Sequence, residues 1–156
     1  MDNGSDKRIR VYVGCGLTHA PPDFIQEVER FKRLLKTHCT VLDFMGISQT
    51  ASPREIYEWD IHKCVMGSDL MIAIANYPST GMGYEASTQI ELRRKPVLFL
   101  ASATAKVSDL ILDINHPFVQ FRRYDSLVQD GMRYAIEAIS SILAQQEADA
   151  PLFTSA

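Results

Sequence analysis

The sequence has no long run of basic residues, no apolar stretch of membrane-spanning length and no closely paired cysteines. Its 16 Lys and Arg residues against 19 Asp and Glu leave a net charge of −3. Duplex nucleic acid is therefore not expected as a partner, because binding it needs a concentrated basic face. No apolar run approaches the ~20 residues that cross a bilayer, and residues 1–10 carry no signal-peptide core. We expect no membrane partner.

Cysteine is scarce, and its three positions, Cys15, Cys39 and Cys64, are widely spaced. Without a C-x-x-C pair, neither a zinc site nor a disulfide framework is indicated. The four histidines show no metal-ligand spacing. We therefore expect no metal and no cofactor, and a reduced, cytoplasmic protein whose cysteines pack as small apolar residues.

Length and composition are those of one globular domain: 156 residues, with an apolar fraction of 46%. The expected organisation is a flexible N-terminus over 1–8, a single domain over 9–145 and a flexible polar tail over 146–156. Strand and helix patterns alternate through this domain. Strands are predicted at 9–13, 40–44, 70–75, 97–100 and 118–121, and helices at about 22–35, 53–66, 83–94 and 127–145, with a short helix within 101–115.

This alternation predicts an α/β fold, a doubly wound five-stranded parallel sheet in a Rossmann-like or flavodoxin-like three-layer sandwich. Right-handed crossovers favour the strand order 2-1-3-4-5. In this order the direction in which strands are added to the sheet reverses between strands one and three, and ligands of such sheets bind at that point. The loops predicted to meet there are 12–19, with Gly14 and Gly16, and 76–85, with Gly81 and Gly83.

The second of these loops carries the most informative segment, in which Pro78, Ser79, Gly81 and Gly83 lead to Glu85. Residues 81–86 formally fit the dinucleotide fingerprint G-x-G-x-x-A. However, the fingerprint belongs after the first strand, and a carboxylate inside it would repel a pyrophosphate. The remaining interpretations are a simple tight turn and a loop that admits a sugar or phosphate.

Three side chains are candidates for chemistry. Glu85 is predicted at a helix start, where the macrodipole alone favours an acid, but its place in the crevice also suits a nucleophile. Asp60 lies beside an apolar helix stripe, where a carboxylate is usually paired, capping or functional. Tyr12 ends the first strand, either as a core residue or with its hydroxyl in the crevice. Asp69, just before the third strand, is interpreted as a turn residue.

Together these residues resemble the nucleoside 2-deoxyribosyltransferase family. The resemblance covers roughly residues 9–143, and its loop is most similar to the branch of 2′-deoxynucleoside 5′-phosphate N-hydrolases. The specific part is the 78–85 segment. The supporting segments are Tyr12-Val13-x-x-x-Leu17-Thr18, Asp60, Ser68-Asp69-Leu70-x-Ile72-Ala73 and Lys95-Pro96-Val97-Leu98.

The resemblance implies a role for each matched residue. Glu85 would attack the anomeric carbon, Asp60 would assist departure of the base, and Tyr12 would place the nucleophile and the sugar. Ser79 would bind the 5′-phosphate, where transferases for free nucleosides tend to carry an acid. Ser108 would complete the phosphate pocket from a neighbouring subunit, in a homodimer or higher homo-oligomer.

The sequence departs from the family at Cys15, which stands where a glycine is usual, and we expect its side chain to tighten the sugar pocket. The spacing from Asp60 to Asp69 is also one residue longer than in some hydrolases. Three functions remain: an N-glycosidase on (deoxy)nucleoside 5′-monophosphates, a nucleoside deoxyribosyltransferase, and a non-catalytic nucleotide sensor. The glycosidase is the first hypothesis, because Ser79 suits a phosphate and a sensor needs no nucleophile.

Overall fold

The computed structural model describes residues 8–44 and 50–149. Its five strands form one sheet of parallel strands in the order β2-β1-β3-β4-β5, which confirms the predicted order. The strands are β1 (Arg10–Cys15), β2 (Thr40–Leu42), β3 (Leu70–Ile74), β4 (Val97–Ser102) and β5 (Val119–Tyr124).

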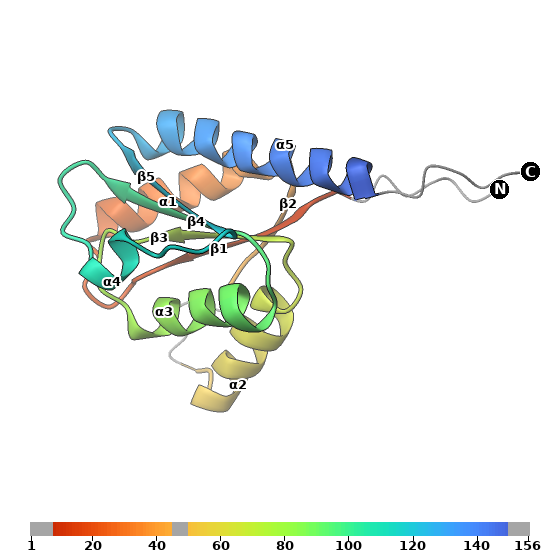
Figure 1. Cartoon of the computed structure of the whole chain (residues 1–156). Coiled ribbons are helices and arrows are strands. Elements are labelled where there is room, and N and C mark those ends of the chain that lie inside the picture. The colour runs from red at the N-terminus through yellow and green to blue at the C-terminus, as the bar shows by residue number, and fades with distance from the viewer. Residues whose placement is uncertain (1–7, 45–49, 150–156) are drawn as a thin grey trace, which may run out of the picture.

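Helices cover both faces of the sheet (Figure 1). They are α1 (Pro22–Leu35), α2 (Pro53–Tyr57), η1 (Glu58–Val65), α3 (Thr80–Ser87), η2 (Thr88–Leu92), α4 (Asp109–Leu112), η3 (Leu127–Gly131) and α5 (Met132–Asp149), where η marks π-helical turns. Helices α1 and α5 lie on one face, and α2, α3 and α4 lie on the other. The three-layer sandwich is therefore confirmed, and none of the described helices is long and apolar enough to span a membrane.

The alternation of side chains along each strand divides the core into two layers. In β1, Val11 and Val13 pack with α1 and α5, whereas Tyr12 faces the layer of η1 and α3. Strand β3 is buried along its whole length, with Ile72 in the first layer and Met71 in the second. Such two-sided burial is typical of a central parallel strand.

Several predicted boundaries shift. The helix predicted from about Gly83 begins at Thr80, because the Ser79 hydroxyl accepts the backbone N–H of Met82 and caps the first turn. Helix α5 runs to Asp149, so residues 146–149 of the predicted tail are helical; Ala, Gln and Glu favour a helix although they are polar or small. Arg8, assigned to the flexible N-terminus, donates to the carbonyl of Lys36. Residues 1–7 and 150–156 lie outside the described part.

The start of α2 matches its sequence pattern. The Ser52 hydroxyl accepts the N–H of Glu55 at 3.2 Å, and the Glu55 carboxylate accepts the N–H of Ser52 at 2.6 Å. This is a capping box, with Pro53 at the first helical position. The helix leads directly into η1, so its first turn fixes where the segment with Asp60 begins.

Replacing Ser52 by alanine should lower the free energy of unfolding by about 1 kcal/mol, because the N–H of Glu55 loses its acceptor. Urea unfolding followed by circular dichroism measures the change. Ser141→Ala is the matched control: this exposed serine lies inside α5, where its hydroxyl donates to the Glu137 carbonyl, and its loss should change stability by less than ~0.5 kcal/mol. Equal effects of the two substitutions would contradict the capping interpretation.

Candidate functional site

The candidate site lies at the carboxyl ends of β1 and β3, which pair directly, with Gly14 opposite Ala73 and Cys15 opposite Ile74. Strand β2 lies on the other side of β1, so the direction in which successive strands are added to the sheet reverses between β1 and β3. On the face of the sheet that carries Tyr12, η1 and α3 pack against the strands in one core layer. Each of these two helices carries one of the predicted acids.

Glu85 and Tyr12 are brought together by this packing. The side chains of the two residues are hydrogen-bonded, and Tyr12 is 1% exposed. Burial raises the pKa of Glu85, the Tyr12 hydrogen bond lowers it, and the negative charge of Asp60 raises it, giving a pKa of about 7. Burial, together with the charges of Glu85 and Asp60, raises the pKa of Tyr12. Tyr12 therefore stays protonated, and its hydroxyl donates a hydrogen bond to the Glu85 carboxylate.

Gly14 makes room for this carboxylate. A Cβ at Gly14 would lie 3.1 Å from Oε2 of Glu85 and 3.2 Å from the terminal methyl group of Met71. Because residues 12 and 14 of a strand face the same side, the absent side chain leaves the space beside Tyr12 that Glu85 fills. The contact that the structure gives for Gly14 is with this carboxylate; its predicted role in substrate binding stays a prediction.

Asp60 lies in η1 and is half-buried. Its charge raises the pKa of Tyr12, of Glu85 and of the Cys64 thiol, so it acts on the same small region. Mutual repulsion of two carboxylates in a partly desolvated space favours the protonated form of one of them. Such a pair can supply one acid and one base, which is the division that cleavage of a glycosidic bond requires.

The nearby thiols do not compete as nucleophiles. Burial raises the pKa of the Cys15 thiol to about 11 and that of Cys64 to about 12. A thiol with such a pKa stays protonated near neutral pH, and it is the thiolate that reacts. Cys64 donates instead to the backbone carbonyl of Asp43, at 3.3 Å.

Ser79 is brought to the same edge by Gly16. A Cβ at Gly16 would lie 2.7 Å from the Tyr77 carbonyl oxygen and 3.1 Å from Cβ of Ser79. The 14–16 segment therefore runs from the Glu85 carboxylate to Ser79, and glycine at position 16 permits the close approach. Since the Ser79 oxygen accepts the N–H of Met82, its hydroxyl hydrogen is directed elsewhere and can be donated to a ligand.

The new start of α3 changes the interpretation of Glu85. Glu85 is the sixth residue of the helix rather than part of its first turn. The helix macrodipole acts mainly within the first turn, so the sequence-based argument that it favours an acid at this position is wrong. Burial and the contact with Tyr12 account for the position of Glu85 instead.

Ser79 and Ser108, the two serines predicted to bind phosphate, line one cavity of about 600 Å³. Ser79 and Thr80 line one wall, and Lys106 and Ser108 line the other, in the segment that leads to α4. Ser108 thus shares a cavity with Ser79 of its own chain; its predicted action across a subunit interface stays a prediction. Lys106 was missed in the sequence, although a cation two residues before Ser108 was the available signal.

The two glycines of α3 differ in their surroundings. Gly83 lines the cavity, and a Cβ there would meet nothing within 4 Å. Gly81 is exposed and does not line the cavity. Both glycines lie inside the helix, so the loop predicted around them is wrong: the capping hydroxyl of Ser79 starts the helix before them.

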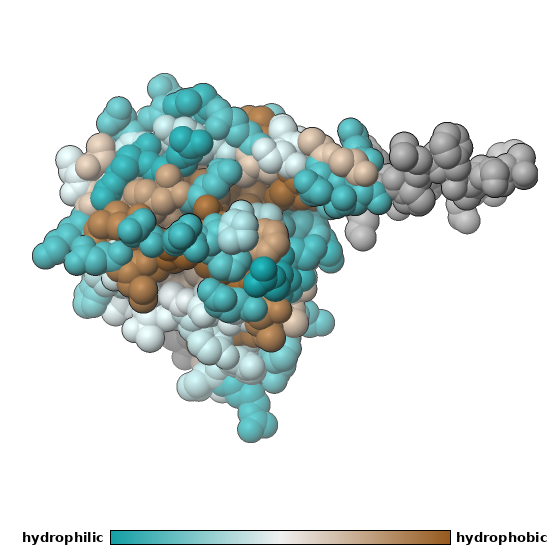
Figure 2. Space-filling model, in the orientation of Figure 1, coloured by the Kyte–Doolittle hydropathy of each residue, from teal (hydrophilic) through white to brown (hydrophobic). Residues whose placement is uncertain are grey.

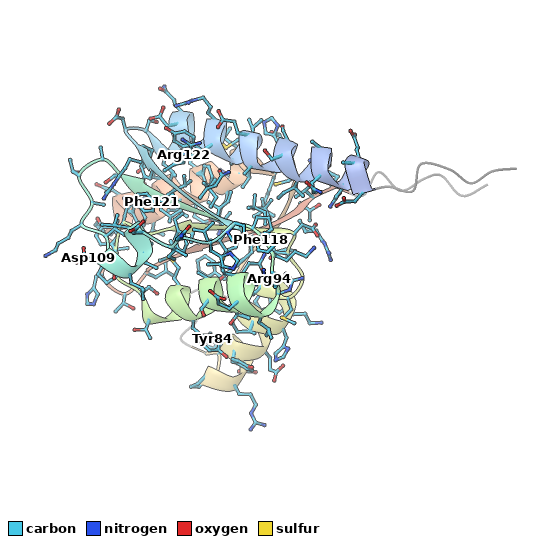
Figure 3. The ribbon with its side chains drawn as sticks, viewed as in Figure 1. Tyr84, Arg94, Asp109, Phe118, Phe121 and Arg122 are labelled. Carbon is cyan, nitrogen blue, oxygen red and sulfur yellow. The ribbon has the colours of Figure 1, made fainter. Side chains whose placement is uncertain are left out.

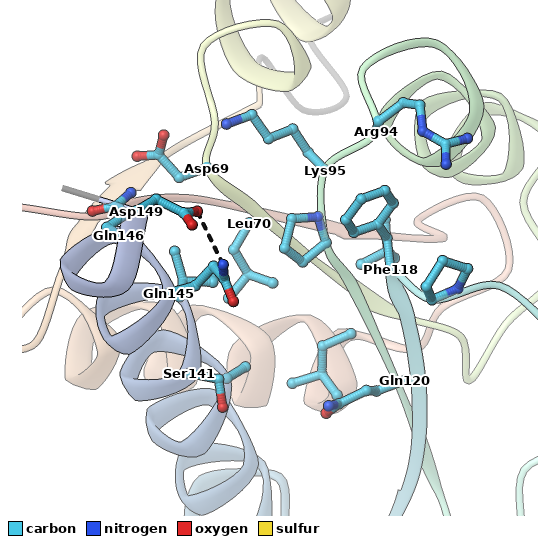
Figure 4. A pocket seen from close by; sticks show the side chains of 16 residues that line it. Asp69, Leu70, Arg94, Lys95, Phe118, Gln120, Ser141, Gln145, Gln146 and Asp149 are labelled. Carbon is cyan, nitrogen blue, oxygen red and sulfur yellow. Dashed lines mark hydrogen bonds between the residues drawn. The ribbon is translucent and has the colours of Figure 1, made fainter. Parts of the chain in front are cut away.

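A second cavity, of about 460 Å³, lies at the opposite edge, by the amino ends of β3 and β4 (Figure 4). Asp69, Arg94 and Lys95 line one side of it, and Gln145 of α5 lines the other. None of the predicted site residues lines this cavity. Among the residues that the structure describes, no group of three or more His, Cys, Asp or Glu side chains is arranged to hold a metal ion.

Comparison with known proteins supports the architecture. No protein-family model and no curated protein sequence matches the chain. Among solved structures, the CMP N-glycosidase BcmB of Clostridium botulinum is similar, with 19% identity, covering 81% of this chain and 98% of that one at a TM-score of 0.59. The lysine decarboxylase LdcF of Francisella novicida is similar at 12% identity and a TM-score of 0.52, over 88% of this chain but 18% of its own. At these identities the likeness shows the fold.

Glu85→Gln should make stability less dependent on pH. In the wild type the pKa of Glu85 rises from an ordinary value of 4.5 to about 7 on folding, so stability is highest below pH 4.5 and falls as the pH rises through 7. The variant should be more stable than the wild type by about 2 kcal/mol at pH 8, and the difference should shrink below pH 5. Urea unfolding across this range measures it; a constant difference would contradict the raised pKa.

Proposed function

We propose that the chain is an N-glycosidase that cleaves the base–sugar bond of (deoxy)nucleoside 5′-monophosphates, giving free base and a (deoxy)ribose 5-phosphate. The observation that carries the proposal is the half-buried Glu85 carboxylate, hydrogen-bonded to Tyr12 and repelled by Asp60, at the switch point of the sheet. The resemblance of residues 78–85 to a family of nucleoside-processing enzymes and the fold shared with a CMP N-glycosidase support it.

The chemistry follows from the two carboxyl groups. The ionised Glu85 attacks the anomeric carbon, and the N-glycosidic bond breaks with its electron pair going to the base. The one proton that the two acids share then lies on Asp60, which gives it to the leaving nitrogen. Water then attacks the anomeric carbon of the sugar–Glu85 ester while Asp60 takes a proton from it, which restores both groups and releases the sugar phosphate.

The cavity lined by Ser79 and Ser108, whose lining does not include Glu85, Asp60 or Tyr12, supports a phosphorylated substrate. The Ser79 hydroxyl retains a hydrogen to donate, while Lys106 and Ser108 stand on the facing wall. An acid at position 79 would repel a phosphate, and the chain has a serine there. The combination favours monophosphates over free nucleosides, and hydrolysis over transfer between free nucleosides.

A substrate panel tests the proposal. The protein is incubated with ribo- and deoxyribonucleoside 5′-monophosphates, CMP among them, and with the matching free nucleosides, and the released base is measured by chromatography. We expect release from monophosphates, with kcat/KM falling as the pH rises through about 7, because the acid pair then loses the proton that Asp60 must give. Glu85→Gln should lower kcat by at least about a thousandfold, and Ser79→Asp should raise KM for monophosphates.

Other outcomes of this panel would replace the proposal. Release from free nucleosides alone, or exchange when a second base is added, would identify a deoxyribosyltransferase. Nucleotide binding without any release would identify a sensor. Full turnover by Glu85→Gln would exclude the glutamate as the nucleophile. Tyr12→Phe is a further check, because loss of the donor should raise the pKa of Glu85 and move the falling limb of the pH profile to higher pH.

An exposed apolar surface on α4, α3 and η2 supports a homo-oligomer, which the family resemblance also implies. Large apolar side chains are exposed on α4 and on the outer face of α3 and η2: Leu110 is 79% exposed, Leu92 71% and Tyr84 56%. Figure 2 shows hydrophobic residues gathered on this side of the molecule, and Figure 3 places Tyr84 and Asp109 there. We propose that this face packs against a second copy of the chain.

Sedimentation of the wild type and of Leu110→Asp tests this pairing. The wild type should sediment as a dimer or larger species, and the aspartate should shift it toward the monomer, because a charge would be buried without a partner. Leu143→Asp is the matched control, since Leu143 is also exposed but lies on α5 across the sheet. A monomeric wild type, or equal shifts by both variants, would contradict the proposal.

A further inference from the structure

The two helices that carry the candidate acids are joined at their carboxyl ends by Arg93. One guanidinium nitrogen of Arg93 donates to the carbonyl of Val65 at 2.7 Å and to that of Ser68 at 2.6 Å. Val65 is the last residue of η1, which carries Asp60, and Arg93 follows η2, the continuation of the helix that carries Glu85. A single side chain therefore bridges both helices.

Buried polar groups hold this bridge in place. The same guanidinium nitrogen donates to Oε1 of Gln89 at 2.9 Å, and the Gln89 amide donates to the Ser68 hydroxyl at 3.2 Å. Ser68 in turn donates to the carbonyl of Val65 at 2.9 Å. Gln89 and Ser68 are both 0% exposed. Buried polar groups of this kind stabilise one arrangement, because any other leaves them without hydrogen bonds.

The bridge is also tied to the strand that carries Tyr12. The backbone N–H of Asp69 donates to the carbonyl of Arg10 at the start of β1, at 2.7 Å, and the Asp69 carboxylate accepts the Arg10 N–H at 2.9 Å. Burial lowers the pKa of Arg93 and the charge of Asp69 raises it, so the guanidinium stays charged. The interpretation of Asp69 as a turn residue therefore omitted its main contact, the pairing with β1.

We propose that Arg93 is a positioning residue: by joining the carboxyl ends of η1 and η2 it sets the separation of the Asp60 and Glu85 carboxyl groups. The inference rests on the proposed function for its catalytic consequence, but the geometric statement is independent of it. Arg93 touches neither carboxyl group in the contacts that the structure gives, so it acts through the helices.

The distance from Arg93 to Glu85 explains how a small change at the bridge would displace the Glu85 carboxyl group. Glu85 lies eight residues before Arg93, which corresponds to roughly 12 Å of helix. A tilt of about 5° at the bridge then moves the carboxyl group by about 1 Å, and a misplacement of that size can lower a rate by about a hundredfold. The apolar contacts between the helices, such as Ile61 and Ala86 in one core layer, are non-directional and do not resist a small tilt as hydrogen bonds do.

A titration experiment tests the geometry without any substrate. The titration midpoint of Glu85 is followed by carboxyl ¹³C NMR in the wild type, Asp60→Asn, Arg93→Met and the double variant. Asp60→Asn should lower the midpoint in the wild type, since the Asp60 charge raises the pKa of Glu85. In the Arg93→Met background, we expect the shift of the Glu85 midpoint caused by Asp60→Asn to differ by at least half from the shift in the wild type. Equal lowering in both backgrounds would overturn the proposal.

Two further variants separate geometry from charge and from folding. Arg93→Lys keeps the charge but cannot reach the same set of acceptors, so it should alter the Asp60 effect as Arg93→Met does. If Arg93→Met fails to fold, Gln89→Met, which removes the buried partner of Arg93, takes its place. An Arg93→Lys variant that behaves as the wild type would show that the charge alone matters and would overturn the proposal.

Kinetics with CMP give the catalytic consequence. Arg93→Met should lower kcat by at least about tenfold and change KM by less than about threefold, because substrate contacts remain while the acids are displaced. Arg94→Met is the matched control: the neighbouring arginine is exposed and its guanidinium lies over the Phe118 ring, with no contact to η1. Ile139→Ala, in the core layer of α5, controls for lower stability.

The outcomes separate the two proposals. If the wild type cleaves no nucleotide but the midpoint experiment gives the expected change, the proposed function fails and the positioning role stands. If CMP is cleaved while Arg93→Met lowers kcat no more than Ile139→Ala, Arg93 is a structural helix cap and the positioning role fails. Loss of activity in Arg94→Met equal to that in Arg93→Met would also overturn it.

Discussion

The hydrogen bond between Tyr12 and Glu85 joins the sheet to a helix, and the arrangement of the site depends on it. Burial pushes the Glu85 carboxyl toward its protonated form, whereas the phenol hydrogen stabilises the carboxylate. The balance leaves an acid that ionises near neutral pH inside a largely apolar layer. Gly14 and the packing of α3 under β1 favour the same contact, because a Cβ at position 14 would lie 3.1 Å from the carboxylate and would crowd it.

Sheet order explains why the remaining groups lie near this contact. The neighbours of β1 are β2 and β3, so the loops after β1 and β3 meet at one edge. The loop after β1 supplies the close approach of Gly16 to Ser79, and the α3 helix after β3 supplies Glu85. The segment before α4 adds Lys106 and Ser108 to the facing wall of the cavity. Three separate parts of the chain thus contribute to one region through a single topology.

Sequence patterns predicted the elements better than their ends. The β-branched apolar run of β1 and the capping box at Ser52 are local, so they could be recognised without coordinates. The start of α3 was misplaced because Gly81 and Gly83 suggested a loop, whereas the hydroxyl of Ser79 caps the helix before them. The end of α5 was misplaced because a polar composition was interpreted as disorder.

By itself, the sequence determined the fold class, the strand order and the edge of the sheet where the candidate residues lie, since these follow from local periodicity and from the handedness of crossovers. It also identified Glu85, Tyr12 and Asp60 as candidates. Only the tertiary structure decided that Tyr12 contacts Glu85, that Asp60 acts on both, and that Arg93 joins their helices. Those relations depend on burial and on contacts between residues distant in the chain, and no local pattern encodes either.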